Sequence, residues 1–208
     1  RRVLFRSLAE SGHATDAVRI EAADGLLRLA RFQGRAGSPN LSQPQLAARN
    51  LDRAQALLAP LPRPEARELL ARVLFERAWL DLWKLGDQHG AEQATKRALG
   101  VYAALGNPSR TLQIERAQAL AELASWQGDF EAERRNGDAG LALIGVPRSA
   151  DDALARFRFA GYRAESVYQT EGAKAALPFY AERAAMVDDF AHADVSPGKL
   201  LSSRTIAW

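Results

Sequence analysis

The residues that most often carry enzymatic or metal chemistry are few in this chain and lie far apart. The chain has no cysteine, which excludes disulfides and thiolate metal sites. His13 and His89 have no histidine or carboxylate at the spacing of a metal site. His192 lies among three aspartates in the sequence DDFAHAD, a pattern that a polar helix end explains more simply than a divalent ion. We therefore expect no metal.

Motifs for catalysis or phosphate binding are also missing from the sequence. No serine lies in a nucleophile elbow, and there is no glycine-rich phosphate loop, His-Arg-Asp or Asp-Phe-Gly. The sequence therefore predicts a protein that is not an enzyme and needs no cofactor. An enzyme with an unfamiliar helical active site is the third alternative, after the two binding functions given below.

The best-formed stretch is Leu69 to Leu105, which predicts two helices joined by a tight turn at Leu85-Gly86-Asp87. Apolar residues recur in both halves at steps of three and four, as one face of a helix requires. We expect Gly106 to cap the second helix and Pro108 to prevent its continuation. The inward residues are Leu70, Val73, Leu74, Ala78, Leu82 and Leu85, then Ala91, Ala94, Ala98, Leu99, Tyr102 and Leu105.

Similar turns recur along the chain at Gly34, Gly86, Gly128 and Gly172, with spacings of 52, 42 and 44 residues. A repeated unit of about forty residues made of two helices is typical of an α-solenoid, in which each repeat covers its neighbour. We predict an all-α, right-handed solenoid of about four antiparallel helix pairs. One domain would span residues 1–195, with 196–208 as a tail or the start of a further helix. A closed helical bundle is the alternative fold.

Composition supports helix and argues against two classes of partner. Apolar residues make up 47% of the chain, and no apolar run approaches the ~20 residues that cross a bilayer. The net charge is only +3, and arginines alternate with glutamates over residues 63–77. Such alternation is typical of a solvated helix face. We expect no nucleic acid partner and no membrane contact within this chain.

Positions around the turn glycines give the chain a resemblance to the tetratricopeptide repeat family. Leu85-Gly86 is followed by Ala98 and Tyr102, as the family's Leu-Gly, small and aromatic positions are spaced. Gly172 with Ala184 repeats the small position. The resemblance covers roughly residues 13–190 and implies a protein-binding solenoid.

The third unit departs from that family pattern, and the period exceeds the family's usual length. Gln127 stands where the family has leucine, and Gly140 stands where it has alanine. Longer helices would account for the longer period.

A narrower resemblance involves residues 29–61, with Gln33-Gly34 and Ser38-Pro39-Asn40-Leu41. It resembles the first repeat of bacterial Ser/Thr protein kinases in which a membrane helix separates the kinase from a C-terminal repeat region. This implies a periplasmic ligand sensor that belongs to a longer protein with an attached signalling domain. The alternative is a cytoplasmic effector domain of a winged-helix or other one-component transcription regulator.

A solenoid of this kind would bind a protein or peptide on its concave face, which the first helix of each pair lines. Tryptophans on these helices are candidate anchors, because aromatic residues contribute much of the binding energy of interfaces. Filling of gaps between repeats is the alternative role of the tryptophans, and simple solvation is that of the polar residues. The candidates are Trp79, Trp83 and Trp126, with Glu115, Gln118, Glu122, Arg158, Tyr162 and Gln169 as a polar rim.

Overall fold

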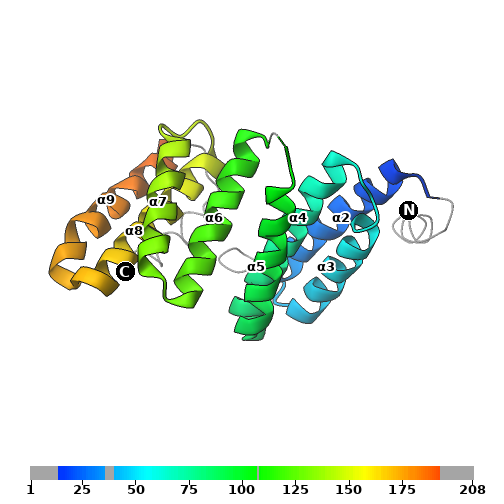
Figure 1. The fold of residues 1–208 in the computed structure, drawn as a ribbon, viewed down its shortest axis with the longest axis horizontal. Helices are drawn as coiled ribbons and strands as arrows, with labels where there is room; N and C mark the ends of the chain where they lie inside the picture. Colours follow the sequence, from blue (N-terminus) through cyan, green and yellow to red (C-terminus); the bar gives the residue numbers. More distant parts are fainter. Residues whose placement is uncertain (1–13, 36–39, 107, 193–208) are drawn as a thin grey trace. The chain divides into compact units, whose positions relative to one another are not determined.

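The computed structural model describes residues 14–35, 40–106 and 108–187 in full. For residues 188–192 it describes the helical backbone alone. Within these residues all regular structure is helical, which confirms the expected all-α class (Figure 1). The expectations for residues 1–13 and 193–208 lie outside the described part. The elements are α2 (Asp16–Gly34), α3 (Pro44–Leu58), α4 (Pro64–Leu80), η1 (Asp81–Leu85), α5 (Gln88–Ala103), α6 (Arg110–Gln127), α7 (Phe130–Ile144), α8 (Ala150–Glu171) and α9 (Ala173–His192).

The chain forms two compact units, Arg1–Asn107 and Pro108–Trp208, called unit 1 and unit 2. In unit 1, α2 packs against α3 and α4 against α5; in unit 2, α6 packs against α7 and α8 against α9. The first helices of neighbouring pairs also touch, α2 with α4 and α6 with α8. We call α2, α4, α6 and α8 first helices, and the others second helices. The single repeat domain over residues 1–195 stays a prediction.

Side-chain caps begin most of the described helices. Thr15 accepts a hydrogen bond from the amide of Val18 at the start of α2. Asp129 caps α7 in the same way by accepting a bond from the amide of Ala132. Ser149 caps α8 by accepting one from the amide of Asp152. These caps satisfy amide groups that a helix leaves unpaired at its start.

Three of the four turn glycines take the left-handed backbone conformation that favours glycine: Gly86 (φ 70°), Gly128 (φ 71°) and Gly172 (φ 87°). Gly34 differs, because it is the last residue of α2 and is buried. A Cβ there would lie 3.1 Å from atoms of both Ala47 and Leu80, so a larger residue would have to displace these neighbours.

The end of α5 also differs from the expectation that Gly106 caps it. The helix ends at Ala103, and the capping residue is Ala104, in right-handed helical conformation. The expectation rested on the sequence Gly-Asn-Pro, but the amides of Ala104 and Leu105 bond to carbonyls three residues back, and this tightening ends the helix earlier.

A π-helical turn, η1, follows α4 and could not be foreseen from the sequence. Leu82 and Leu85 continue the apolar spacing of an ordinary α-helix, whereas the amide of Gly86 bonds to the carbonyl of Asp81, five residues back, as in a π-helix. The amide of Asp87 bonds to the same carbonyl at 2.9 Å. The Asp81 carboxylate is buried and accepts a bond from Arg77 at 2.7 Å. Arg77 also pairs with Asp52 of α3, and so ties this turn to the neighbouring pair.

The unit 2 core explains why a glycine stands at position 140 of α7, where the family pattern has alanine. Phe159 of α8 is fully buried and packs with Ile114 and Ala117 of α6. A Cβ on Gly140 of α7 would overlap the ring of Phe159. Gly140 therefore makes room for a large aromatic side chain.

Candidate binding site

Five of the nine predicted binding residues meet in unit 2, at the contact between the first helices α6 and α8. Glu122 is 4% exposed and lies at the centre. The hydroxyl of Tyr162 donates to its carboxylate, and Gln118 and Trp126 are hydrogen-bonded to it from the same helix. The guanidinium of Arg158 acts on it through its charge. Four-residue steps place these side chains on facing surfaces of the two helices.

Burial sets the charge of this cluster, which we call the Glu122 network. Removal from water raises the pKa of Glu122 to about 7, although the bond from Tyr162 and the charge of Arg158 oppose the rise. Burial, followed by the neighbouring Glu122, raises the pKa of Tyr162 well above its usual value. Near neutral pH the carboxyl can therefore gain or lose a proton. Because it is enclosed by its own neighbours, its main action is on the packing of α6 against α8.

A second buried acid, Glu133 of α7, was missed by the sequence reasoning. It is 1% exposed, and its Oε2 atom has no hydrogen-bond partner among the described residues. Burial raises its pKa to about 7, and the charges of Glu165 and Glu122 add to this against a hydrogen bond with Ser125. One signal could have revealed it. Glu133 shares the inward stripe of Gly137 and Gly140, at steps of four and three.

The two remaining predicted rim residues lie outside the Glu122 network. Glu115 is half-buried on α6, one turn before Gln118. Gln169 is exposed near the end of α8 and donates a 2.8 Å hydrogen bond to Glu165. The other oxygen of Glu165 accepts from the Tyr180 hydroxyl at 2.9 Å. These contacts link α8 to α9.

The two predicted tryptophans of unit 1 form an aromatic pair at the end of α4. The ring centroids of Trp79 and Trp83 are 6.4 Å apart, with the planes tilted by 41°. Trp79 is half-buried, whereas Trp83 lies on η1 and is 59% exposed. Trp83 thus offers an aromatic surface held in place by a neighbour.

The contact between the first helices of unit 1 has a different character from that in unit 2. Near their beginnings, α2 and α4 border a groove in which Ile20 and Leu69 are flanked by carboxylates such as Glu21 and Glu68. Further along, buried Glu76 accepts a 2.8 Å bond from Arg31. Here a full ion pair joins the helices.

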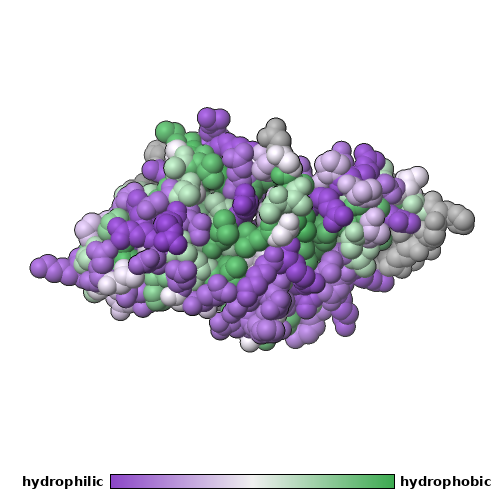
Figure 2. Space-filling view, in the orientation of Figure 1, coloured by the Kyte–Doolittle hydropathy of each residue, from purple (hydrophilic) through white to green (hydrophobic). Residues whose placement is uncertain are grey.

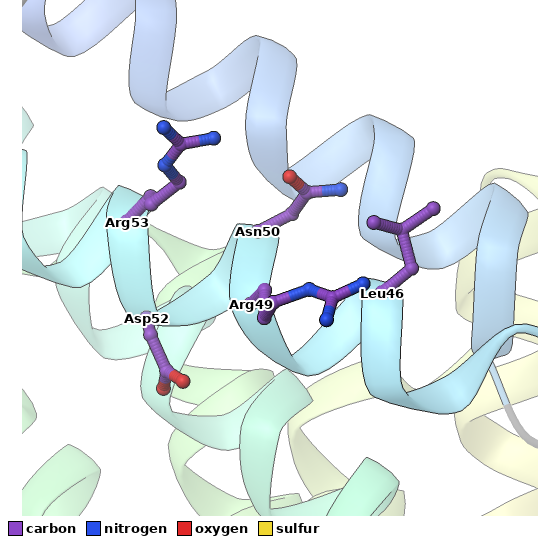
Figure 3. A pocket seen from close by; sticks show the side chains of 5 residues that line it. All are labelled: Leu46, Arg49, Asn50, Asp52 and Arg53. Atoms are coloured by element: carbon purple, nitrogen blue, oxygen red, sulfur yellow. The ribbon is translucent and has the colours of Figure 1, made fainter.

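A shallow pocket on α3 carries no comparable chemistry. Figure 3 shows Asn50 and Arg53 directed toward α2, whereas Asp52 points to the other side of α3. The amide of Asn50 is already bonded to the buried side chain of Gln33 at 2.7 Å. Asp52 is paired with Arg77. The polar groups of this pocket therefore hold neighbouring helices together.

Among the described residues, no group of three or more histidines and acids is placed to hold a metal ion. In the same part of the chain, no helix combines the length and apolarity needed to cross a bilayer. The sequence matches no protein-family model and no curated protein.

Proposed function

We propose that this chain is a non-catalytic sensor module that binds a protein or peptide and transmits its presence to an attached signalling domain. In this proposal the helix pairs form a right-handed, tetratricopeptide-like solenoid of about four repeats. The parent protein is a membrane-anchored bacterial Ser/Thr kinase with this part in the periplasm. Support comes from the helical pairs, the glycine turns and the resemblance over residues 29–61.

The described part of the loop between α2 and α3, which leaves out residues 36–39, agrees with a structural role for Asn40 in the sequence that carries this resemblance. The Asn40 side chain donates a 2.8 Å bond to the carbonyl of Arg35 and accepts one of 2.8 Å from the amide of Ser42. Local bonds of this kind fix a turn.

Exposed Trp83 is the observation that carries the proposal of ligand binding. When a partner covers a large aromatic side chain that is 59% exposed, much apolar surface is removed from water, which favours binding. Its position on a π-helical turn adds weight, because such turns are frequent at functional sites. The ring of Trp79 supports it from behind. A side chain already held in this way loses little conformational entropy on binding.

Trp126 is less suited to the same role. It is half-buried and hydrogen-bonded to Glu122, so a ligand that engaged it would have to disturb the Glu122 network. The proposal therefore makes Trp83 the main anchor.

A random dodecapeptide library displayed on phage tests this function directly. Peptides selected on the wild-type chain are measured for affinity to two variants, Trp83→Ala and Phe32→Ala. Phe32 is a matched control, because it is also 59% exposed and lies in unit 1. We expect Trp83→Ala to weaken binding by about 30-fold, equivalent to a hot-spot loss of about 2 kcal/mol, with little change for Phe32→Ala. Selected peptides that bind both variants with wild-type affinity would contradict the placement.

The attached domain separates the proposal from its alternative. The coding sequence upstream of Arg1 is expected to encode a kinase domain followed by an apolar span of ~20 residues. A winged-helix domain without a span would instead support the cytoplasmic regulator.

A further inference from the structure

Unit 1 has a groove between α3, α4 and α5 whose lining has no role in the function proposed above. It encloses about 600 Å³ between the end of α3, the first half of α4 and the last half of α5. Leu70 and Leu74 of α4 and Val101 of α5 supply its apolar lining. Figure 2 shows hydrophobic surface at the position of α4, beside the mostly hydrophilic surface of α5.

The charges around this groove have one sign. Arg67 and Arg97 line it from α4 and α5, and no aspartate or glutamate lines it. Both arginines are exposed, and neither side chain has a hydrogen bond or ion pair with a described residue. Many of the other described arginines do pair with acids, as Arg31 does with Glu76. The two guanidinium groups are therefore available to an anionic partner.

Gly100 shows that the groove is open along α5. It lies within the helix and lines the groove, and a Cβ there would meet no atom within 4 Å. Glycine in a helix interior costs about 1 kcal/mol relative to alanine. No internal packing contact of this unit requires a glycine at this position, but an approaching ligand would use the free space.

We propose that this groove binds an acidic peptide segment that inserts an aliphatic or aromatic side chain between Arg67 and Arg97. The apolar lining accepts the side chain, and the arginines pair with carboxylates on either side of it. A second copy of this chain fits less well, because the chain is itself basic, with a net charge of +3. The site lies on different residues from Trp83 and does not depend on the function proposed for it.

The test uses a fluorescein-labelled dodecapeptide of alternating glutamate and leucine, followed by fluorescence anisotropy with the whole chain. Two variants remove features of the groove: the double change Arg67→Glu with Arg97→Glu, and Gly100→Leu, which fills it. Each has a matched control elsewhere in unit 1. Arg49→Glu reverses an exposed arginine on α3, and Gly25→Leu fills an open helical glycine on α2. Circular dichroism checks that all variants fold.

We expect the double arginine variant to lose about 100-fold in affinity and Gly100→Leu about ten-fold, with each control within about two-fold of wild type. A peptide with lysine for glutamate, and one with serine for leucine, should both bind at least about ten-fold more weakly.

Four results would overturn the proposal. The first is equal loss with Arg49→Glu, which means general attraction to a basic protein. The second is undiminished binding of the serine peptide, which means that the apolar lining has no role. The third is a dimer that dissociates in the groove variants, which makes a second copy the occupant. The fourth is binding that requires deletion of residues 1–12, which makes those residues the occupant.

Discussion

Units 1 and 2 both bury a glutamate between the first helices of neighbouring pairs, but they surround it differently. Glu76 in unit 1 accepts a bond from Arg31 and lies 3.5 Å from Arg35. Glu122 in unit 2 is hydrogen-bonded to neutral groups, and its pKa rises to about 7. The nearest bonding partners of a buried acid thus decide whether a helix contact responds to salt or to pH.

The two units also differ in how far side chains fill the features described above. Unit 2 closes the contact of α6 with α8 with the Glu122 network and with Phe159, which fits against Gly140. Unit 1 keeps Trp83 exposed and leaves Gly100 facing open space. Both ligand-binding surfaces proposed above therefore lie on unit 1, although unit 2 also exposes single apolar side chains such as Leu177.

The largest expected effect comes from adding one methyl group at a glycine in each unit. Gly140→Ala should lower the free energy of unfolding by about 3 kcal/mol, because the buried ring of Phe159 has no room to move. Gly100→Ala should raise it by about 0.5 to 1 kcal/mol, through helix propensity alone. Urea unfolding followed by circular dichroism measures both. Equal effects of the two changes would remove this difference between the units.

The second prediction concerns pH. In the folded protein the pKa of Glu133 is about 7, above its ordinary 4.5. A raised carboxyl pKa means that the folded state holds its proton more tightly, so this contribution is complete below about pH 4.5 and is lost as pH rises through 7. Glu133→Gln keeps the group neutral and should stabilise the protein by about 2 kcal/mol at about pH 8, with little effect at about pH 4.5.

Thermal unfolding of wild type and Glu133→Gln across this pH range provides the measurement. If Glu133→Gln is no more stable than wild type at about pH 8, the charged carboxylate of Glu133 does not destabilise the folded protein.

A smaller effect is expected from Tyr162→Phe, which removes the hydroxyl donor to Glu122. The loss should be about 1 to 1.5 kcal/mol above neutral pH, where the carboxylate is charged, and smaller near pH 5. Tyr180→Phe is a control, since its hydroxyl donates to Glu165 instead. If the Tyr162→Phe loss is the same at both pH values, ionisation of Glu122 does not act through this bond.

The smallest effect should be that of Glu76→Gln in unit 1, about 1 kcal/mol, because Arg31 and Arg35 are both partly exposed. This loss should shrink in about 1 M salt, which screens ion pairs, whereas the loss in Tyr162→Phe should change little. Chemical denaturation in urea at low and high salt compares the two. If salt instead reduces the loss in Tyr162→Phe and leaves that in Glu76→Gln unchanged, the account of Glu76 as an ion pair and of Glu122 as bonded to neutral groups is wrong.

The helices and most turns could be predicted from the sequence, because they depend on local features. Apolar spacing marked α4 and α5, and glycines marked the turns at Gly86, Gly128 and Gly172. The role of Gly34 could not be foreseen, since its packing against Leu80 joins residues far apart in the chain. The same holds for Gly140 and Phe159. The π-turn at Asp81–Leu85 has an apolar spacing that is also compatible with α-helix.

For the candidate site, the sequence placed Glu122, Trp126 and Tyr162 on first helices but did not predict that they contact one another. Their shared hydrogen bonds depend on how closely α6 and α8 approach, which the sequence pattern does not specify. The exposure of Trp83 likewise depends on the π-turn. Arg67 was read as part of a solvated face and Arg97 was not singled out, because alternation with acids does not show which arginines lack a partner.

The central claim is that Trp83 anchors the ligand while Trp126 stays in the Glu122 network. Nuclear magnetic resonance of nitrogen-labelled indole groups tests it, since the chain has four tryptophans and each gives one indole signal. The selected dodecapeptide should shift the Trp83 signal strongly and that of Trp79 more weakly, with Trp126 unchanged. A bound peptide that shifts the Trp126 signal and leaves that of Trp83 unchanged would contradict the account.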